Sequence, residues 1–327
     1  QTRLSIIDLS KKGHQPMISN CENYIIIFNG EIYNFEEIRA DLISKNYKFN
    51  SNTDTEVILN GYIEYKEQIV NKLNGMFAFS IYDKTNEELF LARDRSGIKP
   101  LYTYHDDKTF TFASEIKSIK RFSKGIDTNS KILFFLLGYI PEPVTIYENI
   151  YSFPAGCFGF LKNNKLSIKE FDKYNYEPKI NKPYKEIISD VKELFNNSIK
   201  RHLISDAPIG TFLSGGLDSS IITAVAAQYK TDLQTLSLVF DEKELSEEKY
   251  QDLIVKKYNT KHTKYLINES LFLDNIDDYF KAMEQPTIDG LNTYFVSKAA
   301  KDNGLTTVLS GVGGDEIFYG YPSFKDG

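Results

Sequence analysis

The chain has little cysteine and no long apolar run, and both absences narrow what it can be. Its 327 residues include two cysteines, Cys21 and Cys157, too few for the disulfide scaffold of a small secreted protein. The longest apolar runs, such as residues 24–28 and 132–137, fall far short of the roughly 18–20 residues of a membrane-spanning helix. We therefore expect a soluble, cytoplasmic protein.

The chain also lacks an excess of positive charge. Lysine and arginine number 39, aspartate and glutamate 45, and the net charge is −6. Such a balance gives no basic surface for nucleic acid or an anionic membrane, so we expect neither as a partner. With 41% hydrophobic and 26% charged residues, the composition is that of a folded globular protein. At roughly 100–200 residues per domain, the length predicts two domains.

The ends lack the features of a complete chain. The sequence begins at Gln1 with no initiator methionine and no targeting segment, and it stops at Gly327, shortly after a glycine-rich stretch. We expect a fragment.

The first half alternates strand-like runs with two helical patterns. Helices are predicted at residues 35–45 and 55–73, the second with Thr53 and Asp54 as its cap and Glu56 in its first turn. Strands are predicted at residues 4–9, 24–28, 76–82, 88–92 and 109–113. Runs of strands with few helical crossovers favour an antiparallel α+β domain.

The second half has a different rhythm. Residues 172–183 contain two prolines and no periodicity, which indicates a linker. Residues 184–203 then form an amphipathic helical pattern. Strands predicted at 209–213, 233–240, 263–267 and 306–309 alternate with helices. This alternation favours an α/β doubly wound parallel sheet, with ligands at the carboxyl ends of its strands.

A loop of glycine and serine is the most informative segment of the second half. It lies between an apolar strand and a helix and reads Ser214, Gly215, Gly216, Leu217, Asp218, Ser219, Ser220. Paired glycines let backbone amides approach an anion, and the helix N-terminus adds unpaired N–H groups and its dipole. The serine hydroxyls add donors, and the Asp218 carboxylate suits the Mg²⁺ that a polyphosphate brings. The loop therefore predicts a phosphate site.

A glycine turn with a serine N-cap is the alternative interpretation of this loop. A bare pair of glycines would favour it, but strand, loop and helix follow one another in register, which favours phosphate binding. The chain contains no GxxxxGK followed by serine or threonine, so the loop is not of the Walker type.

The loop resembles that of the N-type ATP pyrophosphatases, which cleave ATP between the α and β phosphates and activate a carbonyl or carboxylate as its adenylate. A second loop, residues 309–316, also follows an apolar strand. The resemblance implies that Asp218 and Asp315 bind Mg²⁺, that Ser310 and Gly311 touch the nucleotide, and that Phe212 and Leu238 lie beside the adenine. Solvent-facing acids after a glycine-rich cap are the alternative.

Seven segments of the first half resemble glutamine-dependent asparagine synthetase in the order and spacing of that family. They are RLSIIDL (3–9), GHQPM (13–17), FNGEIYNFEEIR (28–39), TDTE (53–56), LNGMFAFSIYD (73–83), ARDRSGIKPLY (92–102) and FASEIK (112–117). The resemblance covers nearly the whole chain. It implies an N-terminal-nucleophile (αββα) glutaminase domain over residues 1–171, a linker at 172–183 and an asparagine synthetase, or ATP pyrophosphatase, domain over 184–327.

The resemblance also implies roles in the first domain. In that family an N-terminal cysteine attacks the glutamine amide, its own α-amine can serve as the base, and ammonia passes through an internal tunnel to the second domain. Arg3 would bind the α-carboxylate of glutamine, and Glu31 and Asp54 its α-ammonium. Asn29 and the Gly30 N–H would form the oxyanion hole. Taken singly, Arg3 as a surface ion pair, residues 29–31 as a hairpin turn and Asp54 as a helix cap are the commoner interpretations.

The chain departs from that family where the nucleophile should stand. In that family the nucleophile precedes the residue that matches Arg3 by several tens of residues. In this sequence only Gln1 and Thr2 precede Arg3. Cys21 and Cys157 are internal, so we interpret them as structural or incidental. As written, the chain cannot form a glutaminyl thioester. The family's lysine that contacts the reacting phosphates has no match here either.

A further departure concerns the acceptor. Val312 stands where typical members carry a carboxylate thought to assist the attack of ammonia. Valine cannot accept a proton, so either another acid such as Glu284 or Asp289 replaces it, or the acceptor is a different carboxylate.

The main hypothesis is therefore glutamine-hydrolysing, ATP- and Mg²⁺-dependent synthesis of asparagine from aspartate, releasing AMP and pyrophosphate. One alternative is an amidotransferase for another carboxylate, and another is an incomplete fragment that only binds nucleotide and glutamine. Because the family often dimerises, the resemblance also implies a homodimer.

Overall fold

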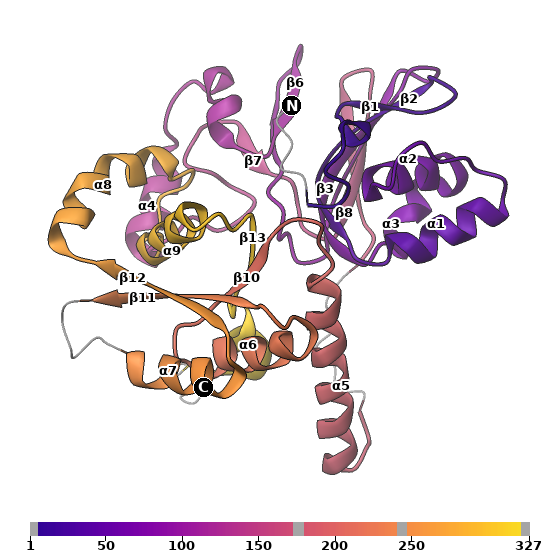
Figure 1. Cartoon of the computed structure of the whole chain (residues 1–327). Helices are drawn as coiled ribbons and strands as arrows, with labels where there is room; N and C mark the ends of the chain where they lie inside the picture. The colour runs from indigo at the N-terminus through magenta and orange to yellow at the C-terminus, as the bar shows by residue number, and fades with distance from the viewer. Residues whose placement is uncertain (1–5, 173–179, 241–246, 322–327) are drawn as a thin grey trace. The chain divides into compact units, whose positions relative to one another are not determined.

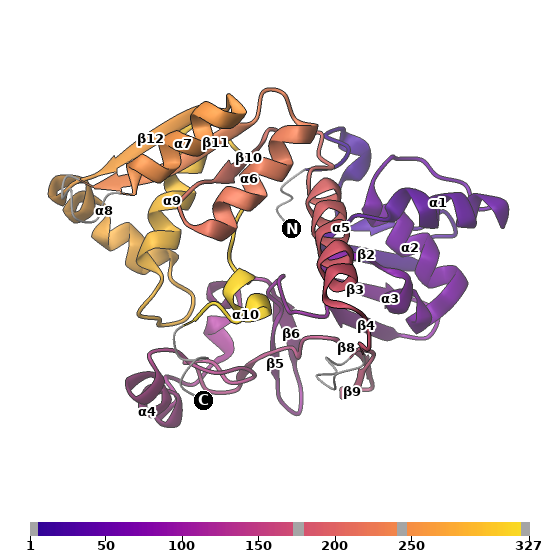
Figure 2. The same ribbon diagram turned by 90° about the horizontal axis from the view of Figure 1, so that it is seen from below.

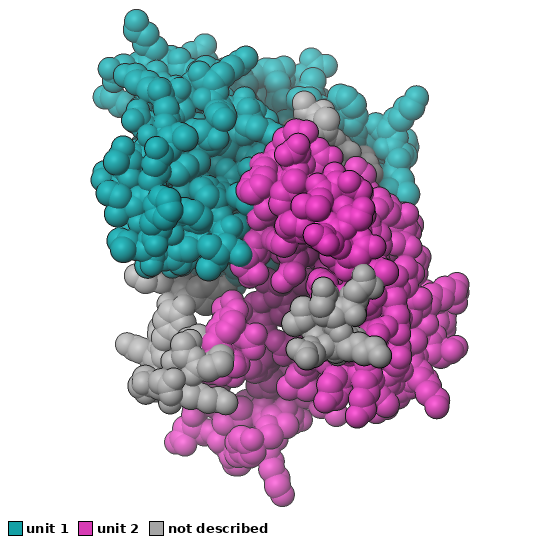
Figure 3. All heavy atoms as spheres, turned by 90° about the vertical axis from the view of Figure 1, so that its left-hand side faces the viewer, with its two compact units in different colours: residues 1–178, 283–288 teal, residues 179–282, 289–327 magenta. Residues whose placement is uncertain are grey.

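The computed structural model describes residues 6–172, 180–240 and 247–321. The chain divides into two compact units (Figure 3). Unit 1 comprises residues 1–178 and 283–288, and unit 2 comprises residues 179–282 and 289–327. No helix in the described parts of the chain is long and apolar enough to cross a membrane.

Unit 1 is built on two antiparallel sheets. The larger sheet has the order β1-β2-β3-β4-β8-β9 and the smaller one β6-β5-β7. The strands of the larger sheet are β1 (Met17–Ile18), β2 (Tyr24–Ile32), β3 (Gly75–Asp83), β4 (Glu88–Arg93), β8 (Cys157–Lys162) and β9 (Lys165–Glu170). Those of the smaller sheet are β5 (Tyr102–His105), β6 (Phe110–Ala113) and β7 (Ile150–Ser152).

Helices cover the outer faces of these sheets. On one side lie α1 (Phe35–Ser44), α2 (Asp54–Tyr65), η2 (Lys66–Gln68) and α3 (Ile69–Lys72), and Figure 1 shows α1 to α3 along the larger sheet. Their apolar side chains, Leu42 and Ile58 among them, pack against Ile26 and Phe79 of that sheet. Four further helices are η1 (Lys11–Gly13), η3 (Ile116–Ser118), η4 (Lys120–Phe122) and α4 (Thr128–Leu137).

Two smaller cores complete the layering of unit 1. Between the sheets, Ala78 and Leu91 pack with Phe112 of β6 and with Phe153. On the outer face of the smaller sheet, Ile116 of η3 and its neighbours pack on the strands. The order helix, sheet, sheet, helix confirms the predicted αββα class.

Unit 2 is a parallel sheet with helices on both faces. Its strands are β10 (Ile209–Phe212), β11 (Gln234–Phe240), β12 (Lys261–Ile267) and β13 (Thr307–Leu309), in the order β12-β11-β10-β13. In Figure 1, α6 (Leu217–Tyr229) and α7 (Glu248–Tyr258) lie below this sheet, while α8 (Glu269–Ala282) and α9 (Leu291–Asp302) lie above it. Figure 2, viewed from below, shows α6 and α7 in front of the strands. The doubly wound prediction is confirmed.

The remaining helices of unit 2 are α5 (Tyr184–His202) and α10 (Gly314–Phe318). The amphipathic pattern predicted over residues 184–203 is confirmed by α5, whose Ile199 joins the core with Ile209 and Val225. Strands β11 and β12 are added in turn on one side of β10. The chain then crosses to the opposite side of β10, where it forms β13. The strand order therefore reverses between β10 and β13, the position at which such sheets bind ligands.

Two predicted elements of unit 1 are wrong in part. The helix predicted over residues 55–73 ends at Tyr65, because Lys66 adopts φ +51°, a left-handed conformation that a helix cannot continue through. Of the strand predicted over residues 4–9, residues 6–9 are not a strand and the rest lies outside the described residues. Asp8, at φ +54°, instead accepts hydrogen bonds from the Ser10 and Asn52 amides at 3.0 and 2.9 Å.

Candidate functional sites

A cavity of about 580 Å³ in unit 1 brings together most of the residues that the sequence predicts to bind glutamine. Asn29, Gly30 and Glu31 reach it from the end of β2, and Asp54 reaches it from the start of α2. Arg3 lies outside the described residues. The cavity also has lining residues that the sequence analysis did not single out: Ile6, Ile7, Gln15, Ser80, Lys99, Leu101 and Phe112.

Asp54 is fixed by the first turn of its helix. The Thr53 hydroxyl accepts a hydrogen bond from the Glu56 amide at 3.2 Å, which confirms the predicted cap. Asp54 is 5% exposed, and its two carboxylate oxygens accept from the Thr55 amide at 2.9 Å and the Ile32 amide at 3.1 Å. The second bond ties the helix start to the end of β2, so Asp54 and Glu31 are held at one place.

Glu31 is a buried acid of this cavity whose pKa is raised. It is 3% exposed, and its Oε1 atom has no hydrogen-bond partner among the described residues. Burial, followed by the charge of Asp54, raises the pKa of Glu31 to about 7, and Lys99 opposes this rise. Burial in turn lowers the pKa of Lys99. A pair of buried acids with an unused oxygen is suited to a small cationic group.

The raised pKa of Glu31 has a consequence for stability. Between about pH 4.5 and 7 the folded protein holds a proton that the unfolded chain has lost, so raising the pH through this window destabilises the fold. We expect the stability of Glu31→Gln relative to the wild type to rise by about 2–3 kcal/mol between pH 5 and pH 8. Chemical denaturation at both pH values measures this difference.

The matched control for this measurement is Glu37→Gln, on the exposed face of α1. Its difference from the wild type is expected to be the same at pH 5 and pH 8. Parallel pH profiles of wild type and Glu31→Gln would show that Glu31 is not the titrating group.

The two cysteines lie away from this cavity. Both are free; Cys21 is exposed and Cys157 is buried. Cys157 packs with Leu101 and Phe153 between the sheets, and burial raises the pKa of its thiol. Cys21 contacts the Ser19 hydroxyl at 3.3 Å, which lowers the pKa of its thiol. Neither cysteine lines the cavity.

In unit 2, the predicted phosphate loop joins β10 to α6 and is held by its own serines. The Ser214 and Ser219 hydroxyls lie 2.9 Å apart, and the Ser214 hydroxyl accepts from the Gly216 amide at 3.2 Å. The Ser220 hydroxyl donates to the Gly216 carbonyl at 2.7 Å. Gly215 adopts φ +99°, a conformation that favours glycine. Helix α6 then begins at Leu217, and its N-cap residue is Gly216, which has no side chain to cap the helix.

Gln251 of α7 supports this loop, and the sequence analysis missed it. It is 2% exposed and donates from Nε2 to the Ser214 carbonyl at 3.1 Å. The signal in the sequence would have been a glutamine on the apolar side of an amphipathic helical pattern. A glutamine buried at such a position needs a polar partner.

The second predicted loop closes on the first. A β-carbon on Gly314 would lie 2.3 Å from Asp218 Oδ2, and one on Gly311 would lie 3.1 Å from Asp218 Cβ. Both glycines therefore make room for the Asp218 side chain. Burial, then the charges of Asp315 and Glu316, raises the pKa of Asp218. The structure thus gathers the predicted metal ligands Asp218 and Asp315 at the point where the strand order reverses.

The chemistry of these carboxylates fits a hard cation such as Mg²⁺. Within the described ranges, no group of three or more His, Cys, Asp or Glu side chains is arranged to hold a metal ion. Two carboxylates alone would leave most of the octahedral shell of such a cation to other oxygen donors, water among them.

The other predicted nucleotide and acceptor residues are placed as follows. Phe212 ends β10, and Leu238 lies in β11 two residues beyond Leu236, the strand partner of Phe212. The Ser310 hydroxyl accepts from the Val312 amide at 3.3 Å. The side chain of Val312 is 91% exposed.

The two acids considered as replacements for Val312 belong to different units. Asp289 is in unit 2, whereas Glu284 belongs to unit 1. There the Glu284 carboxylate accepts from the Lys117 amide at 3.2 Å and lies 3.8 Å from the Lys117 ammonium.

Two family models match the chain. The glutamine amidotransferase domain model matches residues 1–174, and the asparagine synthase model matches residues 190–327. The chain is 37% identical over 351 residues to putative glutamine-hydrolysing asparagine synthetase 2 of Methanocaldococcus jannaschii, covering 99% of the chain and 67% of that protein. It is 36% identical over 330 residues to glutamine-hydrolysing asparagine synthetase 1 of Bacillus subtilis, covering 99% of the chain and 52% of that protein.

The chain thus spans between about half and two thirds of the length of these relatives. Among solved structures, glutamine phosphoribosylpyrophosphate amidotransferase from B. subtilis matches with a TM-score of 0.36 and 15% identity, over 92% of this chain and 64% of that one. At that TM-score the likeness carries no weight for the fold.

Proposed function

Because the chain belongs to the family of glutamine-hydrolysing asparagine synthetases, we propose that it serves ATP-dependent synthesis of asparagine with glutamine as the nitrogen donor. The observation that carries this proposal is the meeting of the two glycine-rich loops around Asp218 at the switch point of the parallel sheet. The buried acid pair Glu31 and Asp54 in unit 1 supports the glutamine half.

In unit 1, Glu31 and Asp54 would bind the α-ammonium of glutamine and Arg3 its α-carboxylate. A cysteine preceding Arg3 would attack the side-chain amide carbon, with Asn29 and the Gly30 N–H stabilising the oxyanion. The C–N bond breaks, ammonia leaves, and water then releases glutamate from the thioester. Both acids come from element ends that the Ile32 to Asp54 hydrogen bond locks together.

In unit 2, a carboxylate oxygen of aspartate would attack the α-phosphorus of ATP, and pyrophosphate would leave. Ammonia then displaces AMP from the aspartyl adenylate to give asparagine. The backbone and hydroxyls of Ser214, Gly215, Gly216, Ser219 and Ser220 would bind the phosphates. Ser310 and Gly311 would touch the nucleotide, and Phe212 and Leu238 would lie beside the adenine. Asp218 and Asp315 would hold Mg²⁺, which when bound neutralises phosphate charge.

Val312 favours a second candidate function, amidation of a carboxylate other than aspartate. Its side chain is exposed on the loop beside the proposed nucleotide site and cannot accept a proton. If the product is asparagine, Glu284 or Asp289 would replace the missing carboxylate that assists the attack of ammonia. If it is not, the acceptor is a carboxylate other than aspartate. A third reading, a module that binds nucleotide and glutamine without turnover, predicts no pyrophosphate release at all.

The test is pyrophosphate release by the full-length protein with ATP, Mg²⁺, ammonium salt and one carboxylate from a panel. We expect release with aspartate well above that with glutamate, succinate or no acceptor. Release with another carboxylate and not with aspartate would support the second candidate. Nucleotide binding without release on the whole panel would contradict both.

We further infer the domain limits 1–171 and 184–327 with a linker at 172–183, a homodimer, and a cytoplasmic location. Size measurement in solution tests the homodimer, and limited proteolysis tests the linker, since exposed interdomain segments are cut first. Protection of residues 172–183 from proteolysis would argue against that boundary.

A further inference from the structure

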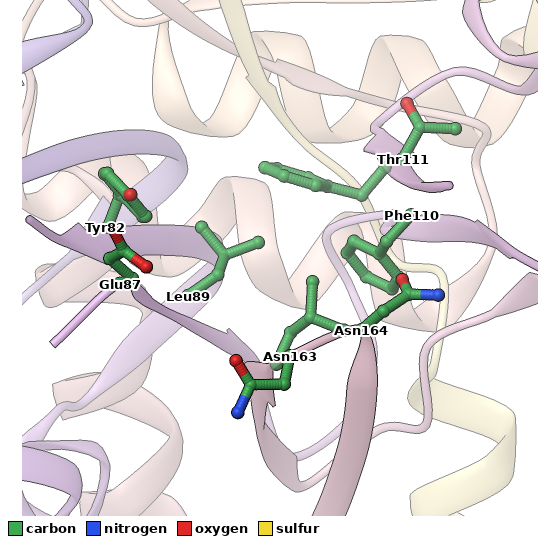
Figure 4. Close-up of a pocket in the computed structure, with 9 residues that line it drawn as sticks. Tyr82, Glu87, Leu89, Phe110, Thr111, Asn163 and Asn164 are labelled. Atoms are coloured by element: carbon green, nitrogen blue, oxygen red, sulfur yellow. The ribbon is translucent and has the colours of Figure 1, made fainter. Parts of the chain in front are cut away.

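A second cavity lies beside the first in unit 1. Its volume is about 410 Å³. The exposed residues Tyr82, Glu87 and Asn163 line it, and Leu89 and Phe110 form an apolar part of its wall (Figure 4). Among the described residues, Phe112 alone lines both this surface cavity and the 580 Å³ cavity described above, which we call the glutamine cavity.

Two strands from opposite sheets run from one cavity to the other. Along β3, Ala78 and Ser80 line the glutamine cavity, and Tyr82, the next residue on the same face, lines the surface cavity. Phe112 of β6 faces both cavities, while Phe110, two residues earlier, lines the surface cavity alone. The two cavities therefore lie between the same pair of strands, and Phe112 belongs to the lining of both.

The wall of the glutamine cavity carries a hydroxyl without a hydrogen-bond partner. Ser80 is 3% exposed, and its Oγ has no hydrogen-bond partner among the described residues. An unpaired buried hydroxyl is costly unless a small polar molecule reaches it. Water and ammonia are both small enough to bind there and both offer the missing hydrogen bond. A small neutral molecule can therefore be held in the glutamine cavity, whose lining also includes Phe112.

We propose that Phe112 seals a second way out of the glutamine cavity and so keeps released ammonia from solvent. This inference rests on the proposed function. The glutamine cavity is also lined by the exposed residues Ser114 and Glu115, and in the proposed function glutamine or glutamate would occupy that side during turnover. Ammonia that passed Phe112 would reach the surface cavity, take a proton from water and be lost as ammonium. The seal directs it instead to the ATP-dependent site.

The test compares Phe112→Ala with the matched control Phe110→Ala in full-length protein. Glutamate and asparagine are measured in the same reaction with glutamine, ATP and aspartate. We expect the ratio of asparagine to glutamate to fall severalfold in Phe112→Ala and to remain at the wild-type value in Phe110→Ala. Synthesis from added ammonium salt should be the same in all three proteins, which shows that unit 2 is intact, and wild-type glutamate release shows that unit 1 is folded.

A second variant, Phe112→Val, removes less of the side chain and keeps the test valid if Phe112→Ala does not fold. Its ratio of asparagine to glutamate should lie between those of the wild type and Phe112→Ala. An unchanged ratio in Phe112→Ala and Phe112→Val, or an equal fall in Phe110→Ala, would overturn the seal. A wild-type protein that hydrolyses no glutamine would instead overturn the proposed function, so the two failures are distinct.

Discussion

Asp218→Asn is expected to lower ATP-dependent pyrophosphate release by about 100- to 1,000-fold, the usual cost of removing one preorganised group that stabilises transition-state charge. The side chain lies against Gly311 and Gly314, where no β-carbon fits. Its carboxylate is therefore held at the meeting point of the two loops, next to Asp315 and Glu316. Asparagine keeps the shape of the side chain but removes the charge that would bind Mg²⁺.

The matched control is Asp232→Asn. Asp232 pairs with Lys261 at 3.2 Å on the surface, just before β11 begins and so away from the carboxyl ends of the strands. Such exposed pairs contribute about 0–1 kcal/mol, so we expect wild-type activity. Calorimetry of ATP with Mg²⁺ gives the second readout. Unchanged ATP affinity and turnover in Asp218→Asn would remove Asp218 from the nucleotide site.

The geometry of the proposed nucleotide site could be predicted largely from the sequence because its signals are local. An apolar strand, a glycine pair and a helix follow one another within about twenty residues, and the structure has β10, the loop and α6 in that order. The contact between the two loops is a different matter. It depends on β13 lying beside β10, and the order of strands in a sheet is set by packing rather than by local pattern. For that step only the resemblance pointed to Asp315.

The cavity of unit 1 was less accessible to sequence reasoning. Glu31 and Asp54 lie on separate elements, and what joins them is one hydrogen bond from the Ile32 amide to Asp54. Lys99 and Ser80 join the same cavity from positions that carry no distinctive pattern. Strands β1, β5, β7, β8 and β9 were not predicted, since strands of two to six residues are too short for a periodic pattern to identify them. Without them the second sheet, and with it the passage past Phe112, could not be foreseen.

Gly30→Ala is expected to destabilise unit 1 by about 3 kcal/mol or more, because it combines backbone strain with overpacking. Gly30 adopts φ +152°, and a β-carbon there would lie 2.1 Å from the Met76 carbonyl oxygen and 2.8 Å from Phe77 Cα. Both obstacles are backbone atoms of the neighbouring strand β3, so no side chain can move aside. Strand β2 must shift, and Asn29 and Glu31 shift with it.

The control for this substitution is Gly125→Ala in the same unit. No atom lies within 4 Å of a β-carbon at Gly125, so its stability should change by less than about 0.5 kcal/mol. Thermal unfolding of the full chain should show the transition of unit 1 lowered by roughly 6–12 °C in Gly30→Ala and unchanged in Gly125→Ala. Because the cavity that we propose to bind glutamine is built on the same strand end, we expect glutamine binding to weaken together with stability. Wild-type stability in Gly30→Ala would contradict this close approach, because β2 and β3 would then be far enough apart at Gly30 to accommodate a β-carbon.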